Sequence, residues 1–376
     1  MANVKAAVIG LGFVGRVHCE NLRRVPGVRL KAVATRNPEK LRYYQEAFGV
    51  SRTETDWRAL LDAGVDVIHN CTPNSLHYEI NRAFIEAGVD VISEKPLTLT
   101  VAEAEALVEL ANENRVTHAV CFNYRFFPVV QEMRARIMSG EIGEVRAIHG
   151  GYIQDWLLYE TDYNWRLEPG EGNTRAVADI GSHWIDLARF LSGKEVARVV
   201  SDLATFIPQR KKPRGERETF ARGREAEAYE PVKIETEDWA AILFEMEGGI
   251  RGSLIVSQVA PGRKNRLHIE VDGSRRSLFW DLEQPNYLWI GERDEANRVL
   301  IDDPALLTTQ AYSLYPGGHN EGWGDAQKNL LASIYRSIGD GSEASDFPTF
   351  TDGLAAMRFE EVVLSSANER RWIELT

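Results

Sequence analysis

A cluster of glycines near the N-terminus constrains this chain more than any other feature. Between an apolar run at residues 6–9 and a helical pattern at residues 14–25 stands the hexapeptide Gly10-Leu11-Gly12-Phe13-Val14-Gly15. Glycines at this spacing allow a tight turn, a close approach of the backbone to a ligand, and close packing of the helix on the strand. The N-terminus of the helix then presents free N–H groups to an anion. The pattern predicts a strand, a phosphate-binding turn and a helix, and a tight turn that binds nothing is the alternative.

Short β-rich runs alternate with helical patterns through the first 125 residues. The runs expected to be strands are residues 6–9, 30–34, 65–70, 89–93 and 116–121. The patterns expected to be helices are residues 14–25, 38–48, 77–87 and 101–112. This alternation predicts a parallel sheet covered on both faces. With the glycine turn after its first strand, it predicts a dinucleotide-binding Rossmann domain at residues 1–125.

The second half of the chain has a different pattern. Helices are expected at residues 128–138, 180–191, 326–339 and 353–368. Strand-like runs occur at residues 145–154, 196–206, 239–244, 252–259, 266–271, 277–280 and 287–290. Short turn sequences such as Gly248-Gly249 and Asp272-Gly273 separate some of these runs, which favours antiparallel pairing. The predicted fold class is therefore α/β, with a C-terminal α+β domain at residues 126–376 that contains a large open, mostly antiparallel sheet.

Composition argues against several partners. The net charge is −12, whereas a nucleic-acid binder normally has a basic excess. No apolar run approaches the ~18 residues of a membrane span, and the N-terminus lacks a signal-peptide pattern. The three cysteines form neither a disulfide framework nor a metal pattern, so we expect no metal and a cytoplasmic location. The basic run Arg210-Lys211-Lys212-Pro213-Arg214, in a charged segment that reaches to about residue 229, is interpreted as a solvated loop rather than a binding patch.

The end of the second expected strand bears on the cofactor. An NAD site usually has an acidic residue there, which holds the ribose 2′-hydroxyl. This chain has Thr35 and Arg36 instead. A 2′-phosphate would meet no carboxylate, and a guanidinium can pair with it. The expected cofactor is NAD(P), with NADP favoured, unless Arg36 stacks on the adenine or points to solvent.

Three further groups of residues indicate chemistry. Glu94-Lys95-Pro96 and Cys71-Thr72-Pro73-Asn74 each follow an expected parallel strand, at the sheet edge where ligands bind in such folds. Asp179 and His183 are four residues apart and would share one face of a helix. Each group has a structural alternative: Lys95 could be simply exposed, His183 could be an interior histidine, and Asp179 could be a helix N-cap.

Together these motifs resemble the Gfo/Idh/MocA family, which includes glucose–fructose oxidoreductases and inositol dehydrogenases. The resemblance covers nearly the whole chain. The matching residues are Glu94-Lys95-Pro96 for E-K-P, Thr72, Pro73 and His77 for T-P-x-x-x-H, and Asp179 and His183 for D-x-x-x-H. Further similar stretches are Asn123-Tyr124-Arg125-Phe126, Asn164-Trp165-Arg166 and Gly318-His319-Asn320-Glu321-Gly322. Tyr152-Ile153-Gln154-Asp155-Trp156 and Phe206-Ile207-Pro208 are similar to family members that act on sugars such as levoglucosan.

The resemblance implies roles for individual residues. It implies that Lys95 and His183 meet over the nicotinamide, with Asp179 as the third catalytic residue. With the glycine turn, Thr35 and Arg36 derived above, the predicted cofactor-binding residues are Gly10, Gly12, Phe13, Val14, Gly15, Thr35, Arg36, Thr72, Pro73, Asn74, His77, Glu94, Lys95, Asn123, Trp165 and Arg166. The implied substrate-binding residues are Lys95, Tyr124, Gln154, Asp155, Trp156, Asp179, His183 and His319. Trp156 and Trp165 could instead be core aromatics. Five further histidines lie within helix or strand patterns and are interpreted as structural: His18, His69, His118, His149 and His268.

The chemistry fits these residue types. Hydride leaves a carbinol carbon only as the hydroxyl loses its proton, for which a histidine with a pKa near ~6.5 is a suitable base. A lysine can stabilise the developing alkoxide. We therefore predict hydride transfer between a secondary alcohol of a sugar, sugar derivative or cyclic polyol and a nicotinamide cofactor, in a homodimer or homotetramer. There are two alternatives. One is a non-catalytic dinucleotide sensor, which would not need Lys95 and His183, and the other is a glycosidase that uses NAD transiently.

Overall fold

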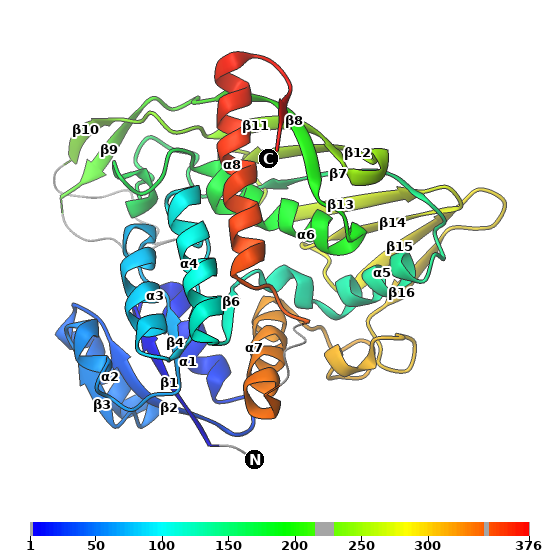
Figure 1. Ribbon diagram of the computed structural model, residues 1–376. Coiled ribbons are helices and arrows are strands. Elements are labelled where there is room, and N and C mark those ends of the chain that lie inside the picture. Colours follow the sequence, from blue (N-terminus) through cyan, green and yellow to red (C-terminus); the bar gives the residue numbers. More distant parts are fainter. Residues whose placement is uncertain (1–2, 215–228, 342–345, 376) are drawn as a thin grey trace. The chain divides into compact units, whose positions relative to one another are not determined.

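The computed structural model describes residues 3–214, 229–341 and 346–375 (Figure 1). The chain divides into two compact units. The first consists of Met1–Phe122, Gly170–Gly172 and Gln327–Met357, and the second of Asn123–Pro169, Asn173–Ala326 and Arg358–Thr376. The first unit thus takes in a late stretch of the chain that the expected boundary near residue 125 does not include. The charged segment after Arg214 lies largely outside the described residues.

The first unit contains a six-stranded sheet in which all neighbouring strands are parallel. Its strand order is β3 (Arg52–Glu54), β2 (Val28–Ala34), β1 (Val4–Ile9), β4 (Val67–Asn70), β5 (Asp90–Ser93) and β6 (His118–Val120). The parallel sheet was predicted, whereas the short strand β3 was not. The chain order reverses between β1 and β4, and a ligand crevice is expected outside the carboxyl ends of the strands at such a point.

Helices cover both faces of this sheet. They are α1 (Phe13–Leu22), α2 (Pro38–Phe48), α3 (His77–Glu86), α4 (Val101–Asn114) and most of α7 (Trp323–Asp340). Phe84 of α3 and Leu107 of α4 share one buried cluster with Ile68 of β4. The next residue, His69, points to the opposite face, because successive side chains of a strand alternate. There it contacts His18 of α1 and Tyr335 of α7.

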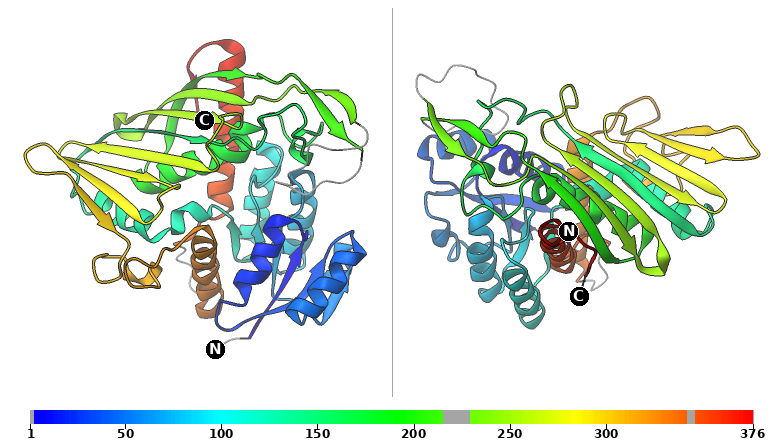
Figure 2. Two further views of the ribbon diagram at one scale, coloured as in Figure 1. Left: turned by 180° about the vertical axis from the view of Figure 1, so that it is seen from behind. Right: turned by 90° about the horizontal axis from the view of Figure 1, so that it is seen from above.

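The second unit contains a nine-stranded sheet (Figure 2). Its order is β16 (Arg298–Ile301), β15 (Tyr287–Glu292), β14 (Arg276–Asp281), β13 (Arg266–Gly273), β7 (Val145–Ile153), β12 (Arg251–Ser257), β11 (Trp239–Met246), β8 (Val196–Ala204) and β17 (Ile373–Glu374). All neighbours are antiparallel except β7 and β12, which run parallel. The mostly antiparallel sheet was predicted, and the parallel central pair was not.

One face of this sheet is buried and the other is open. Along β11, Ile242 and Phe244 are buried while Leu243 between them is 52% exposed. The covered face packs against α5 (Pro128–Met138) and α6 (Ser182–Ser192), where the ring of Trp184 lies 5.8 Å from that of Phe244. Leu243 and Tyr287 are exposed apolar side chains of the sheet. Among the residues that the structure describes, no helix has the length and apolarity of a transmembrane segment.

One expectation and one structural alternative are wrong in this unit. The basic run does not form a solvated loop, because Gln209–Pro213 is strand β9, paired with β10 (Tyr229–Lys233), and Arg210 is buried. Asp179 is not a helix N-cap either. It lies inside a π-helical segment, Val177–Gly181, that continues directly into α6.

Candidate active site

The glycine turn is shaped by main-chain contacts. A Cβ atom on Gly10, whose φ is +90°, would lie 2.4 Å from the carbonyl oxygen of Cys71. A Cβ on Gly15 would lie 1.9 Å from the carbonyl oxygen of Gly10. A Cβ on Gly12 would meet nothing within 4 Å. Packing therefore requires Gly10 and Gly15, while Gly12 borders open space at the N-terminus of α1. The binding of a pyrophosphate at this place stays a prediction.

Cationic groups lie near the end of β2, where an NAD site usually has a carboxylate. Thr35 donates its N–H to the carbonyl of Glu54 at 3.1 Å, and Arg36 is exposed. Lys40, in the first turn of α2, places Nζ 3.4 Å from the carbonyl oxygen of Leu11 in the glycine turn. Lys40 was not predicted, because it lies in helix α2 and not at the end of the strand, where the cofactor-selecting residue usually stands.

His77 connects the two strand-end loops that carry predicted site residues. Its Nδ1 lies 2.7 Å from the carbonyl oxygen of Pro96, and its Nε2 lies 3.0 Å from that of Thr72. Burial lowers the pKa of His77, although both carbonyls oppose the shift. A neutral imidazole has one N–H, so it donates to one of these carbonyls at a time. His77 thus holds the loop after β4 against the loop after β5, and its predicted role in cofactor binding stays a prediction, as does that of Asn74, which donates to the carbonyl of Glu171.

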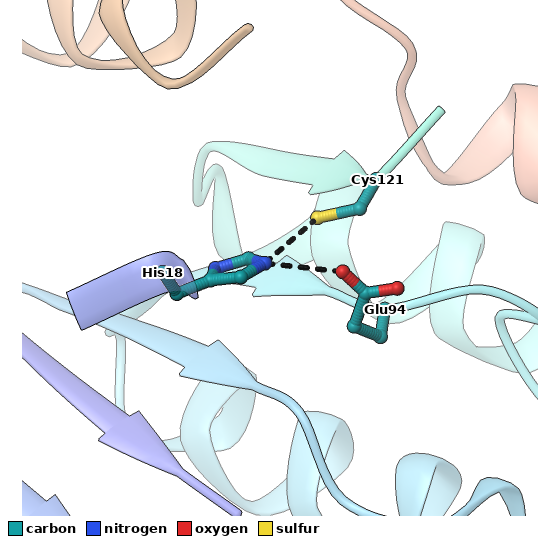
Figure 3. A group of neighbouring side chains, drawn as sticks. All are labelled: His18, Glu94 and Cys121. Carbon is teal, nitrogen blue, oxygen red and sulfur yellow. Dashed lines mark hydrogen bonds and ion pairs between the residues drawn. The ribbon is translucent and has the colours of Figure 1, made fainter. Parts of the chain in front are cut away.

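A buried chain of hydrogen bonds ends at Glu94, next to Lys95 (Figure 3). His18 Nε2 lies 3.0 Å from Glu94 Oε1 and 3.9 Å from the Cys121 thiol. His18 Nδ1 lies 2.7 Å from Nδ1 of His69, and His69 Nε2 lies 2.7 Å from the hydroxyl of Tyr335. Histidine, glutamate and cysteine are also ligands that Zn²⁺ uses, but here a hydrogen bond already joins His18 to Glu94. The cysteine spacing could not reveal this cluster, because its members come from three separate elements.

The charges in this chain follow from burial and partners. Burial lowers the pKa of His69 well below its usual range, helped by the neighbouring His18, so His69 is neutral. Burial alone would raise the pKa of Glu94, but the hydrogen bond and charge of His18, with Lys95 next in importance, bring it below its ordinary value. Glu94 is therefore a held carboxylate beside the predicted catalytic lysine.

In the second unit, His183 lies in a group of aromatic and polar side chains. It is buried in α6, and its ring centroid lies 4.6 Å from that of Tyr124. The hydroxyl of Tyr152 donates to Asn265 Oδ1 at 2.7 Å, so the hydroxyl of Tyr124 donates to that of Tyr152 at 2.6 Å. Burial raises the pKa of both phenols, which keeps them protonated and able to donate hydrogen bonds.

The predicted substrate stretch continues this polar group. Gln154 Nε2 donates to Asn265 Oδ1 at 2.6 Å, and Trp156 Nε1 donates to Gln154 Oε1 at 2.9 Å. Asp155 pairs with Lys264 and accepts the N–H of Gly262. The structure thus brings Tyr124, Gln154 and Trp156 into one network, and their predicted contact with the substrate stays a prediction. Asn265, which joins them, was missed because its place depends on the pairing of β13 with β7.

Asp179 is held from two sides. Its Oδ1 accepts from Arg166 Nε at 2.9 Å, and its Oδ2 accepts from Gln258 Nε2 at 2.9 Å. The Arg166 guanidinium lies 4.3 Å over the ring of Trp165. Arg166 and Trp165 therefore contact Asp179 and each other, and their predicted contact with the cofactor stays a prediction.

Other predicted site residues lie elsewhere. His319 is exposed on a loop and bonds through Nδ1 to the carbonyl of Pro316 at 3.0 Å. Asn123 is buried at the start of a short 3₁₀ turn, Asn123–Phe126. Lys95 belongs to the first unit and His183 to the second, so their expected meeting over the nicotinamide also stays a prediction.

The parallel sheet and its glycine turn define the first unit as a dinucleotide-binding domain of the oxidoreductase type. The chain belongs to the Gfo/Idh/MocA family. Residues 4–122 match the family described as "Oxidoreductase family, NAD-binding Rossmann fold", and residues 130–279 match the "GFO/IDH/MocA C-terminal domain". The resemblance found in the sequence is therefore confirmed.

Relatives with known names support the same assignment. Levoglucosan dehydrogenase of Pseudarthrobacter phenanthrenivorans is 29% identical, with 100% of this chain and 99% of the relative covered. Inositol 2-dehydrogenase of Rhizobium meliloti is 26% identical, with 99% of each chain covered. A solved structure of levoglucosan dehydrogenase in complex with NADH and L-sorbose superposes with a TM-score of 0.91 at 28% identity, covering 100% of both chains.

Proposed function

We propose that this protein is a nicotinamide-dependent dehydrogenase that transfers a hydride between a secondary alcohol of a sugar, sugar derivative or cyclic polyol and the cofactor. The main support for this proposal is the set of side chains that surrounds His183. A histidine here lies against Tyr124, within a network of hydroxyl, amide and indole groups. Such groups offer donors, acceptors and aromatic faces to a polyhydroxylated ring.

Each catalytic residue has a distinct proposed role. The bound cofactor would supply the hydride acceptor. His183 takes the hydroxyl proton, because histidine is the side chain whose ordinary pKa lies near neutrality. Lys95 stabilises the developing alkoxide as a cation held beside the Glu94 carboxylate. Asp179, whose oxygens are held by Arg166 and Gln258, either orients the base or binds a second substrate hydroxyl.

The cofactor preference is proposed to be NADP. The support is the lack of a carboxylate at Thr35, the exposed Arg36, and Lys40 close to the glycine turn. Arg36→Ala should weaken NADP binding about ten- to a hundredfold more than NAD binding, since one charge-assisted contact is lost. Equal losses for both cofactors would show that Arg36 stacks on the adenine. A wild-type preference for NAD would overturn the proposal.

A reduction screen tests the function directly. NAD⁺ and NADP⁺ are offered with inositols, aldoses, anhydrosugars and glycosides, and reduced cofactor is followed by absorbance. Formation of NAD(P)H from a free polyol without glycosidic cleavage would exclude the transient-NAD glycosidase. Binding of cofactor with no turnover of any substrate would favour the sensor.

Lys95→Ala is the matching variant. The cation acts chiefly in the transition state, so kcat should fall by ~10²–10³ while cofactor affinity stays within about tenfold. If kcat survives within a few-fold, Lys95 is not at the chemistry. The predicted cytoplasmic location and homodimer or homotetramer stay predictions, and light scattering tests the latter.

A further inference from the structure

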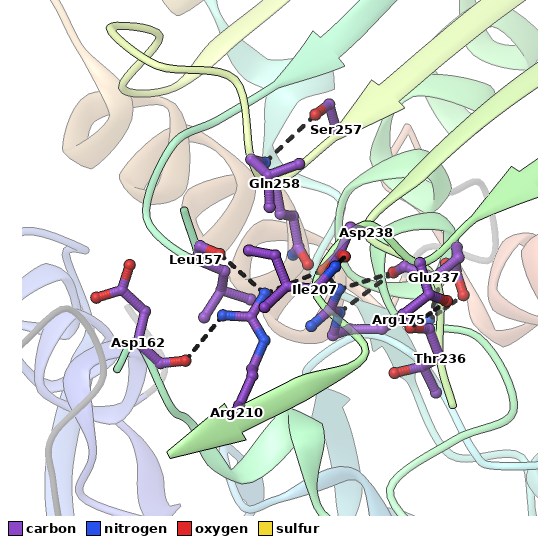
Figure 4. A network of polar contacts seen from close by, with 12 residues as sticks. Leu157, Asp162, Arg175, Ile207, Arg210, Thr236, Glu237, Asp238, Ser257 and Gln258 are labelled. Atoms are coloured by element: carbon purple, nitrogen blue, oxygen red, sulfur yellow. Dashed lines mark hydrogen bonds and ion pairs between the residues drawn. The ribbon is translucent and has the colours of Figure 1, made fainter. Parts of the chain in front are cut away.

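Four buried charged side chains form a network next to Gln258, whose side chain donates to Asp179 (Figure 4). They are Arg175, Arg210, Glu237 and Asp238, with exposed fractions of 2%, 1%, 4% and 0%. Two positive and two negative groups balance each other. Buried charges persist in proteins only where partners and hydrogen bonds compensate their desolvation. Hydrogen bonds connect this network to two segments of the chain. The proposed function assigns substrate binding or catalysis to residues next to both segments.

The first segment is the start of the helix that carries Asp179 and His183. The carboxylate of Glu237 accepts the N–H groups of Arg175, at 2.9 and 3.0 Å, and of Val177, at 2.8 Å. Val177 begins the π-helical segment that leads into α6. A carboxylate at this place satisfies free N–H groups at the helix start and lies favourably in the helix dipole. Glu237 therefore fixes where this helix begins.

The second segment is the loop that follows Trp156. Arg210 donates from Nη2 to the carbonyl of Leu157 at 2.9 Å and from Nη1 to those of Tyr159 and Asp162 at 2.9 and 3.0 Å. Its Nη2 also donates to Asp238 Oδ1 at 3.0 Å. One guanidinium thus holds three carbonyls of residues 157–162, beside a main-chain bond from the N–H of Lys211 to the carbonyl of Glu160 at 2.7 Å. A planar group with several rigidly placed donors is suited to this, and a lysine is not.

Asp238 joins the two segments. Its Oδ1 accepts from both Arg210 and Arg175, and its Oδ2 accepts the N–H of Ile207 at 2.8 Å. Its carbonyl accepts the N–H of Gln258 at 3.0 Å, and the side chain of Gln258 donates to Asp179. The loop, the helix start and Asp179 therefore share one anchor at the beginning of β11.

We propose that Arg210 is a positioning residue for substrate recognition: it holds the loop at residues 157–162, and with it Trp156, in register with the helix of Asp179 and His183. Arg210 itself does not contact the substrate. The consequence for substrate binding rests on the proposed function, whereas the role of Arg210 in ordering the loop depends only on its hydrogen bonds to residues 157–162.

Hydrogen–deuterium exchange tests the hold without any need for activity. The test variant is Arg210→Met, and the matched control is Lys212→Met. Lys212 is a partly exposed cation of the same strand β9, and its side chain pairs with Glu168. Amide exchange in residues 157–162 should rise about tenfold or more in Arg210→Met and stay at the wild-type rate in Lys212→Met. Unchanged exchange in a folded Arg210→Met would overturn the proposal.

Steady-state kinetics test the consequence. With the best substrate of the screen, Arg210→Met should raise KM about tenfold or more, leave kcat within about threefold and keep the pH profile, because binding is lost without loss of the base. Arg210→Lys keeps the charge and serves if the methionine variant fails to fold, and its exchange and KM should be intermediate. A changed melting temperature with unchanged KM and exchange would show a structural role alone. If the wild type turns over no sugar or polyol, the proposed function fails, and the exchange result still decides the role of Arg210.

Discussion

The glycine turn and the surroundings of His183 are built in opposite ways. The turn consists of six consecutive residues whose shape is set by main-chain contacts, such as the approach of Gly15 to the carbonyl of Gly10. The His183 group consists of side chains drawn from residues 124–265, joined by hydroxyl and amide contacts. The glycine turn depends on the absence of side chains, whereas the His183 group depends on side chains that are held in place by one another.

The sharpest test of this contrast replaces His183. If the second region performs the chemistry, His183→Asn should reduce turnover by ~10²–10⁴, because the shape is kept and the base is lost. In the wild type, kcat/KM for oxidation should rise with pH through one ionisation between ~5.5 and 8. That rise should be absent from the pH profile of the variant.

The same profile separates the neighbours of the base. Asp179→Asn should shift the midpoint without removing the rise, as expected of a group that orients the histidine. If His183→Asn keeps the wild-type rise, the ionisation belongs elsewhere, and Lys95 becomes the candidate base.

Two alanine variants test the glycine turn. Gly15→Ala must push against the carbonyl of Gly10, so the chain without cofactor should lose about 1–3 kcal/mol of unfolding free energy. Gly12→Ala meets no protein atom within 4 Å, so stability should be unchanged, while cofactor affinity should fall about tenfold because the backbone can no longer approach a pyrophosphate. Thermal melts with and without NAD(P) measure both effects. Full cofactor affinity in Gly12→Ala would mean that the turn does not hold the phosphates.

A pH-dependent effect concerns the interior of the first unit, away from the glycine turn. Burial lowers the pKa of His118 to about 4, and its Nδ1 accepts the N–H of Phe350 at 3.1 Å. The unfolded chain, with a pKa near ~6.5, binds this proton more readily. Stability should therefore fall as the pH drops from about 6.5 to 4, by no more than about 3 kcal/mol from this residue.

His118→Asn provides the comparison, because its amide oxygen can accept the same N–H without titrating. Denaturant melts between pH 4 and 7 should show a shallower pH dependence for the variant than for the wild type. Equal slopes would assign the loss to other buried histidines, such as His69 and His77, whose pKa values burial also lowers.

Local signals were sufficient for much of the fold. Helix α2 begins at Pro38 and ends at Phe48, as predicted, because Asn37 caps its first N–H groups and Gly49 adopts a φ of +64° after it. The strands and helices of the first unit follow the same alternation that the sequence shows. These features depend on residues within a few positions of each other, so one sequence suffices to predict them.

Contacts between distant segments could not be predicted in this way. Arg210 belongs to a basic run typical of a solvated loop, and its burial depends on Asp238 and on three carbonyls of residues 157–162. Asn265 and Gln258 reach the predicted site only through the register of β13 and β12 on β7. Nothing in the local pattern of either residue distinguishes it from an ordinary surface polar residue.

The position of β7 has a consequence for how the protein is made. This strand ends at Ile153, yet its two neighbours in the sheet, β12 and β13, begin at Arg251 and Arg266. The ribosome adds ~5–20 residues per second, so roughly 5–20 seconds pass between the synthesis of β7 and that of its two neighbours. During that time an unpaired strand is open to pairing with other chains. We therefore expect the yield of soluble protein in cell-free synthesis to depend on chaperones acting before β13 emerges, more than on any step after release.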